Sequence, residues 1–347
     1  TRHSTLFPYT TLFRSFLAAW QHAVPAGQVK KGDGMRNIIA AIFTVVALTV
    51  GQSVLAADCT AGSKQLVFMS GGQAQTVALV LPAGRAADAR LPLVIGLHPS
   101  SGTGQSFDDD TGLASAATRR GFAVLLPDGA ISTDDGRGHY WNIPGVPLTS
   151  GAEVPQGTRD DLRFLGDAID AAVAGHCIDA GRVYVTGFSG GARMTSMVAC
   201  RMADRIAAVV PVGGLRAGRA KGKDFSEPDP EDCRPSKAVR VLAIHGTDDK
   251  TNPFPGGGGL RWGYSVEVAA ARWASLDHCS GAPRSEKVSS HVTRVLYGAC
   301  AAGSAVELYR IDAPEAQGGG HVWPGGRRSP PSELKATELA LEFFGRR

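Results

Sequence analysis

A serine, an acid and a histidine occur in three short polar motifs, in that order along the chain. Ser189 lies in the motif GFSGG, Asp248 and Asp249 lie in HGTDDK, and His321 lies in GGGHVWPGG. A serine hydroxyl becomes a strong nucleophile when a histidine accepts its proton and a carboxylate orients that histidine. The three motifs therefore predict nucleophilic catalysis by Ser189, with His321 as base and one of the two aspartates as acid.

Each of these residues also has a purely structural interpretation. Ser189 could occupy a glycine-rich turn without reacting, either aspartate could bond to the backbone of its own turn, and a single histidine is most often a surface or packing residue. The order serine, acid, histidine favours catalysis, because it is the order of α/β-hydrolases, in which each member follows a strand.

Strands and helices must bring these motifs together. Apolar runs predict strands at 65–69, 76–81, 91–97, 123–127, 183–186, 207–212, 239–244 and 306–311. Amphipathic stretches predict helices at 112–120, 160–174, 191–203, 265–277 and 333–344. The alternation predicts an α/β-hydrolase fold: a mostly parallel central sheet with helices on both faces, an antiparallel first pair of strands, and a single catalytic domain.

The first 56 residues differ from the rest of the chain. Residues 1–34 contain TLFPYTTLFRS, which resembles a translated sequencing adapter, so we interpret them as a cloning artefact. Residues 35–56 combine a positive charge, a short apolar run and small residues, which predicts a signal peptide and a secreted or periplasmic protein. The alternative is an uncleaved membrane anchor, although the run is short for a membrane span.

Charge and cysteine content narrow the function classes for residues 57–347. This part holds 31 basic and 31 acidic residues. Because it has no excess of basic residues, the sequence does not predict binding to nucleic acid or to an anionic membrane surface. It also holds all six cysteines, an even number that suggests disulfides in an exported protein. The cysteines form no CxxC pair, so the sequence does not predict a structural zinc site.

Six cysteines allow 15 pairings, and their positions relative to the predicted elements favour one of them. We expect bonds between Cys279 and Cys300, between Cys200 and Cys233, and between Cys59 and Cys177. The alternative is that some of these cysteines are buried free thiols.

The motifs GFSGGARMT, HGTDDKTNPF and GGGHVWPGG together resemble the secreted esterase family of polyhydroxybutyrate depolymerases and feruloyl or acetyl-xylan esterases. The blocks LHPSSGTG, PDG, YWN and DDLRFL extend the resemblance from about Leu91 onward. The resemblance implies that the acid is Asp249 rather than Asp248. It also implies an acyl-enzyme that water resolves, with no metal or organic cofactor.

The oxyanion formed during such a reaction needs two hydrogen-bond donors. The backbone N–H of Gly190, at the predicted start of a helix, is one candidate. The resemblance implies that Ser100 supplies the second. At this point the chain departs from the family, because it has His98-Pro99 where the family has His-Gly, and proline has no N–H to donate.

Three long loops, 129–156, 213–238 and 250–263, follow strand ends at which such sheets bind ligands. Trp141, Trp262 and Trp323 lie in or near these loops, so they could stack on a substrate or pack at the edge of the core. We expect a monomer that hydrolyses a polyester or short hydroxyalkanoate esters, with a feruloyl or acetyl-xylan esterase as the alternative. A secreted serine peptidase, which on this fold usually carries an extra gating domain, and a non-catalytic binding module are remoter alternatives.

Overall fold

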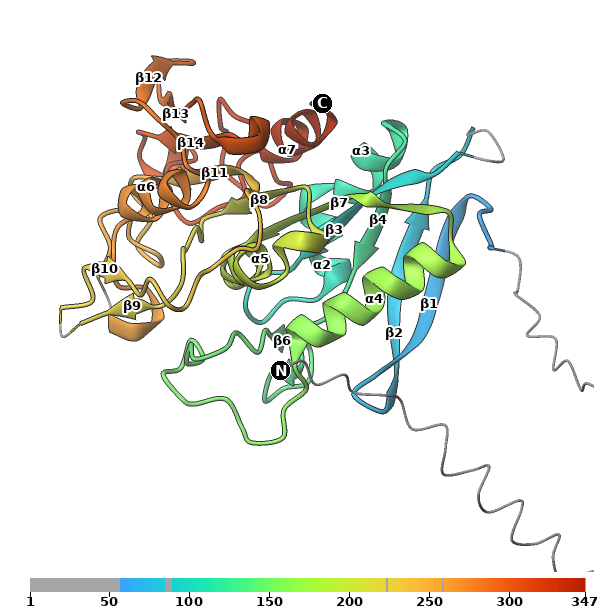
Figure 1. The fold of residues 1–347 in the computed structure, drawn as a ribbon. Coiled ribbons are helices and arrows are strands. Elements are labelled where there is room, and N and C mark those ends of the chain that lie inside the picture. The colour runs from blue at the N-terminus through green and yellow to red at the C-terminus, as the bar shows by residue number, and fades with distance from the viewer. Residues whose placement is uncertain (1–56, 85–88, 223, 258, 347) are drawn as a thin grey trace, which may run out of the picture. The chain divides into compact units, whose positions relative to one another are not determined.

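The computed structural model describes residues 57–84, 89–222, 224–257 and 259–346. The expected artefact (1–34) and signal peptide (35–56) lie outside the described residues. Figure 1 shows one large sheet with helices packed against it. Its ten strands have the order β1-β2-β4-β3-β7-β8-β11-β14-β13-β12.

The strands of this sheet are β1 (Gly62–Ser70), β2 (Gln73–Leu81), β3 (Leu91–Leu97), β4 (Ala123–Leu126), β7 (Ile178–Phe188), β8 (Ala208–Val212), β11 (Arg240–Gly246), β12 (Arg284–Lys287), β13 (Val292–Tyr297) and β14 (Val306–Ile311). The six strands from β4 to β14 in the sheet order run parallel to their neighbours. Antiparallel pairs, β1-β2 at one edge and β13-β12 at the other, flank them.

The central strands require cover on both faces because they are apolar on both sides. Every residue of β8 is buried, and so is nearly every residue of β3 and β11. The buried residues form two clusters, one on each face of the sheet. This explains why the sequence places long amphipathic stretches between the strands.

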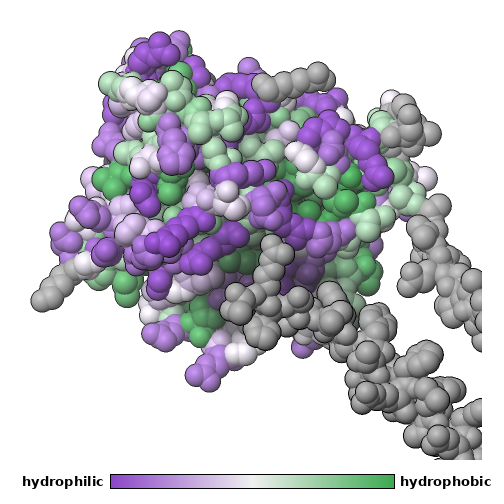
Figure 2. All heavy atoms as spheres, viewed as in Figure 1, coloured by the Kyte–Doolittle hydropathy of each residue, from purple (hydrophilic) through white to green (hydrophobic). Residues whose placement is uncertain are grey.

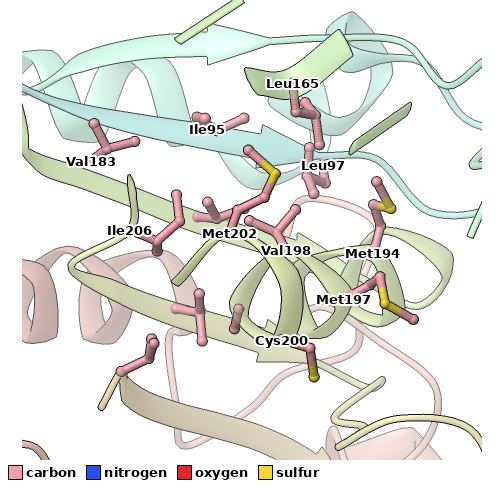
Figure 3. Packing of buried hydrophobic residues seen from close by; sticks show 14 of the residues in the cluster. Ile95, Leu97, Leu165, Val183, Met194, Met197, Val198, Cys200, Met202 and Ile206 are labelled. Atoms are coloured by element: carbon pink, nitrogen blue, oxygen red, sulfur yellow. The ribbon is translucent and has the colours of Figure 1, made fainter. Parts of the chain in front are cut away.

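Six helices supply the cover. On one face lie α4 (Asp161–Gly175), α5 (Gly190–Arg201) and α6 (Val266–Leu276); on the other lie α2 (Gly104–Thr111), α3 (Leu113–Arg119) and α7 (Ala336–Gly345). Figure 3 shows Met194 and Val198 of α5 in the same buried cluster as Leu97 of β3. This helix is buried almost all round, so its first turn is held firmly against the sheet.

Shorter elements lie within the connecting loops. They are β5 (Ile131–Ser132), β6 (His139–Tyr140), β9 (Ala220–Lys221), β10 (Glu227–Pro228) and the 3-10 turns η1 (Ala203–Arg205), η2 (Gly259–Arg261), η3 (Ala301–Gly303) and η4 (Glu315–Gln317). The three predicted long loops are therefore mostly irregular chain.

The expected mostly parallel sheet with helices on both faces is confirmed, and each predicted strand and helix has a counterpart. Besides the short elements of the connecting loops, three elements were not predicted: α2, β12 and β13. Helix α2 has a polar sequence and is started instead by a capping box between Thr103 and Ser106. Strand β12 is fully exposed, so it carries no apolar pattern, and it forms by pairing with β13.

Three disulfides join Cys59 to Cys177, Cys200 to Cys233 and Cys279 to Cys300, the same pairs that the sequence analysis expects. On the face shown in Figure 2, hydrophilic residues surround small hydrophobic areas. Within the described ranges, none of the helices has the length and hydropathy to cross a membrane.

Candidate active site

Ser189 occupies a sharp turn between β7 and α5. Its backbone has φ 54° and ψ −112°, a region that residues other than glycine rarely adopt. The turn brings α5 very close to β3: a Cβ added to Gly191 would lie 2.1 Å from the Leu97 carbonyl oxygen. Glycine at 191 therefore permits a strained turn that presents the serine hydroxyl above the strand ends.

Hydrogen bonds connect Ser189, His321 and Asp249 in a chain. The Ser189 Oγ lies 2.8 Å from His321 Nε2, and His321 Nδ1 lies 2.7 Å from Asp249 Oδ2. A carboxylate only accepts hydrogen bonds, so the His321 proton sits on Nδ1 and Nε2 is free to accept the serine proton. The structure thus brings together the three residues of the predicted triad.

Asp249 is held as a buried carboxylate. Its Oδ1 accepts hydrogen bonds from the N–H groups of Thr251 (2.9 Å) and Asn252 (2.7 Å), and its side chain is almost inaccessible to solvent. Burial acts to raise the pKa of Asp249, but hydrogen bonds from His245 and His321 outweigh it and hold the pKa below its usual range. Asp249 is therefore ionised whenever His321 works as a base.

Asp248 lies apart from this chain. Its carboxylate accepts a hydrogen bond from the Glu315 N–H at 3.0 Å and forms an ion pair with Lys250 at 2.5 Å. The bond from Glu315 ties the end of β11 to the turn before the His321 loop. The side chain of Asp248 thus stabilises the loop, and the acid beside His321 is Asp249.

His245 is a second histidine beside Asp249, and the sequence analysis did not identify it. Its Nε2 lies 2.9 Å from the Asn252 carbonyl oxygen and 3.3 Å from Asp249 Oδ2, and the ring is fully buried. Because both neighbours are acceptors, Nε2 carries the ring proton. His245 therefore contacts Oδ2 of Asp249, the same carboxylate oxygen that His321 contacts. Only its position at the end of an apolar strand, four residues before Asp249, could have indicated this.

The loop that carries His321 depends on close backbone contacts. A Cβ added to Gly319 would lie 1.7 Å from the Ala313 carbonyl oxygen, so glycine lets this loop fold back over the end of β14. The ring of Phe188, the residue before the nucleophile, packs against the His321 ring with 4.9 Å between centroids. Both contacts limit the positions that the imidazole can take.

The two predicted oxyanion donors lie side by side. A Cβ added to Gly190 would come within 3.0 Å of the Ser100 backbone nitrogen. The first N–H groups of a helix have no partner within the helix, which leaves the Gly190 N–H available. In the part of the chain that the structure describes, the Ser100 N–H also donates to no protein group.

His98 fixes the loop that carries Ser100. Its Nε2 accepts a hydrogen bond from the Gly129 N–H at 3.0 Å, and its Nδ1 lies 2.8 Å from the Pro99 carbonyl oxygen, to which it donates. Burial lowers the pKa of His98 from 6.5 to about 4, so the ring is neutral at physiological pH. The Pro99 carbonyl also accepts the Gly102 N–H at 2.9 Å, so the proline sits in a closed turn and leaves Ser100 beside Gly190.

The structure corrects the expectation that the three loop tryptophans could stack on a substrate. Trp141, Trp262 and Trp323 expose only 4%, 1% and 1% of their surface. Each indole N–H donates to a protein oxygen: the carbonyls of His98 and Pro253, and the Thr337 hydroxyl. Their rings pack at the core edge, and Trp141 stacks on His98.

Hollows open from the oxyanion donors toward the surface. One of about 10 Å³ is lined by Ser100, Gly190 and Arg193, and one of about 20 Å³ shares Arg193 with it as a lining residue. A larger hollow of about 390 Å³ lies between the Asn142–Val154 segment and Leu260. Among the described residues, no group of three or more acidic, histidine or cysteine side chains could hold a metal ion.

The chain is similar in sequence to known esterases. Residues 75–246 match the family model described as Esterase PHB depolymerase. The chain is 28% identical to feruloyl esterase B of Piromyces equi over 257 residues. This aligned region covers 72% of this chain and 43% of that protein. It is also 30% identical to poly(3-hydroxyalkanoate) depolymerase C of Paucimonas lemoignei over 134 residues. That aligned region covers 39% of this chain and 30% of that protein.

A solved structure shares the fold. The acetyl xylan esterase from Aspergillus awamori superposes with a TM-score of 0.51 at 16% identity, covering 78% of this chain and 93% of that one. The chain spans less than half the length of the Piromyces equi and Paucimonas lemoignei relatives.

Proposed function

Because the chain belongs to the Esterase PHB depolymerase family, we propose that it is a serine carboxylic-ester hydrolase with Ser189 as its nucleophile. The observation that carries the proposal is the hydrogen-bonded chain from Ser189 through His321 to Asp249. In an arrangement of this kind the serine attacks an ester carbonyl while the histidine takes its proton.

The protons move along this chain in both halves of the reaction. His321 Nε2 accepts the Ser189 proton as the Oγ attacks, and the imidazolium then protonates the leaving alcohol. Asp249 keeps the Nδ1 proton in place and stabilises the charged ring. Water then attacks the acyl-enzyme while His321 removes its proton, and the imidazolium returns that proton to Ser189 Oγ as the acyl group leaves as a carboxylic acid.

The amides of Ser100 and Gly190 stabilise the tetrahedral intermediate. The carbonyl oxygen becomes negative as Ser189 attacks, and preorganised N–H groups bind that charge more strongly than they bind the neutral ester. Each such donor contributes roughly 3 kcal/mol to the transition state. His98 positions the Ser100 amide for this role because it is bonded to both the Gly129 N–H and the Pro99 carbonyl.

For the substrate we propose polyester or short hydroxyalkanoate esters. The family match and the similarity to a poly(3-hydroxyalkanoate) depolymerase support this class. A feruloyl or acetyl-xylan esterase is the second candidate, and one observation favours it: the similarity to a feruloyl esterase extends over a longer part of the chain.

We also propose export to an oxidising compartment. Three disulfides support it, since such bonds persist outside the reducing cytosol. The signal-like residues 35–56 would direct that export.

Ester hydrolysis tests the proposed activity directly. The purified protein should hydrolyse 4-nitrophenyl butyrate but not peptide 4-nitroanilides, and Ser189→Ala should remove the activity while the circular dichroism spectrum stays unchanged. Polyhydroxybutyrate film, methyl ferulate and acetylated xylan then rank the substrate classes. Equal ester hydrolysis by the parent and Ser189→Ala proteins would rule out the proposal.

A further inference from the structure

The buried guanidinium of Arg193 has no hydrogen bond or ion pair to any residue that the structure describes. It lies on α5, four residues after Ser189, and exposes 6% of its surface. Neither its Nε nor its Nη1 has a hydrogen-bond partner among the described residues. An unpaired buried charge opposes folding, so such a group is retained only where something else requires it.

The arginines around it each have at least one protein partner, although Nη2 of Arg216 has none among the described residues. Arg216 donates hydrogen bonds to the carbonyl oxygens of Leu215, Trp262 and Tyr264 and packs against two aromatic rings. Arg219 pairs with Asp232 at 3.3 Å, and Arg261 donates to the Thr251 carbonyl oxygen at 3.1 Å. These arginines therefore have structural roles that Arg193 lacks.

The surroundings of Arg193 lead to the predicted reaction centre. Arg193 lines both small hollows, and the hollow of about 10 Å³ also touches Ser100 and Gly190. Among the described residues that line these two hollows, none is Asp or Glu. Burial lowers the pKa of Arg193 to about 9, with smaller contributions from Arg261 and Arg216, so the guanidinium remains charged at neutral pH.

We propose that Arg193 binds a carboxylate of the substrate, so that the site takes esters with a free carboxylate close to the scissile bond. This inference rests on the proposed esterase function and deepens it. A guanidinium forms strong, charge-assisted hydrogen bonds with a carboxylate, and burial of the Arg193 side chain limits screening by water. The free end of a hydroxy-acid oligomer is such a group, on the alcohol side; the half-ester of a dicarboxylic acid carries it on the acyl side.

Matched substrate pairs test this recognition and distinguish the two sides. On the acyl side, 4-methylumbelliferyl hydrogen glutarate is compared with 4-methylumbelliferyl pentanoate. On the alcohol side, 3-acetoxybutanoate is compared with 3-acetoxybutanamide. For each pair, the ratio of kcat/KM for the charged to the neutral ester is measured in the parent, Arg193→Met and Arg201→Met proteins. Arg201 is the control, because it lies on the same helix but pairs with Asp232 outside both hollows.

In at least one pair, Arg193→Met should lower the charged-to-neutral ratio about tenfold or more, while Arg201→Met leaves it unchanged. An unchanged ratio in both pairs would overturn the proposal, although hydrolysis of the neutral esters would still support the esterase function. No hydrolysis of any ester would refute the esterase function itself.

Inhibition of the parent protein gives a second test that does not depend on a variant folding. The proposal predicts that 3-hydroxybutanoate or glutarate inhibits hydrolysis of a neutral ester at concentrations about tenfold lower than the corresponding amide does. Equal inhibition by acid and amide would contradict it.

Discussion

Asp249 and Asp248 are adjacent in the chain but bind different partners. Asp249 accepts a hydrogen bond from His321, whereas Asp248 accepts one from the Glu315 N–H. An amide at 249 would favour the wrong His321 tautomer, so Asp249→Asn should reduce kcat for 4-nitrophenyl butyrate roughly 10³- to 10⁴-fold. Asp248→Asn should change it less than about threefold. Steady-state kinetics on both variants decides this, and a larger loss at 248 would contradict the assignment of the acid.

His98 gives the fold a pH dependence of defined sign. Its pKa is lowered by burial from 6.5 to about 4, so between these values the unfolded chain binds a proton that the folded chain does not. Stability should therefore fall as pH drops through this window, by about 2 kcal/mol between pH 6.5 and 4.5 from this residue.

Urea unfolding of the parent protein and His98→Gln at the two pH values measures this contribution. Glutamine cannot titrate, so the variant should lose about 2 kcal/mol less between pH 6.5 and 4.5 than the parent does. Equal losses in the two proteins would show that His98 is not the group responsible.

At the scale of elements, the junction of β7 and α5 depends on the absence of a side chain at 191. Gly191→Ala would place a methyl group 2.1 Å from the Leu97 carbonyl oxygen and force α5 away from β3. Both stability and ester hydrolysis should fall sharply. The control is Gly175→Ala at the end of α4, where an added Cβ meets nothing within 4 Å and the backbone suits alanine. Thermal unfolding and kcat/KM on both variants test this, and a fully active Gly191→Ala protein would contradict it.

Elements with a strong hydrophobic pattern could be predicted from the sequence, and those formed by pairing could not. Buried strands such as β8 are continuous apolar runs, and Asp160 caps α4 by accepting hydrogen bonds from the Leu162 and Arg163 N–H groups. By contrast, β12 has the sequence RSEK with every residue exposed. Its conformation comes from a neighbouring strand rather than from its own side chains.

The residues of the candidate site also divide into those whose role could be predicted from the sequence and those whose role could not. Ser189, Asp249 and His321 follow strands in a recognisable order, so their meeting could be expected. The role of His245 depends on which acceptors surround one ring nitrogen, and that is decided by packing. Burial of the three tryptophans likewise depends on how the loops fold, which their polar composition does not reveal.

At the scale of the whole molecule, disulfides join segments that are distant in the sequence. The Cys279–Cys300 bond spans 21 residues and closes the segment that holds β12 and β13, just before β14, whose far end leads to His321. Replacing both cysteines with serine should reduce the free energy of unfolding by about 3 kcal/mol, mainly by freeing the unfolded chain. Urea unfolding beside the exposed control Ser280→Ala measures this, and a loss no larger than that of the control would contradict it.

The most direct test of the account is to identify the atom that carries the acyl group during turnover. The protein is mixed rapidly with 4-nitrophenyl butyrate and quenched in acid, and its intact mass and proteolytic peptides are measured. We expect a mass increase of one butyryl group, located on Ser189, and no such adduct in Ser189→Ala. An acyl group on another residue, or an adduct of equal amount in Ser189→Ala, would contradict it.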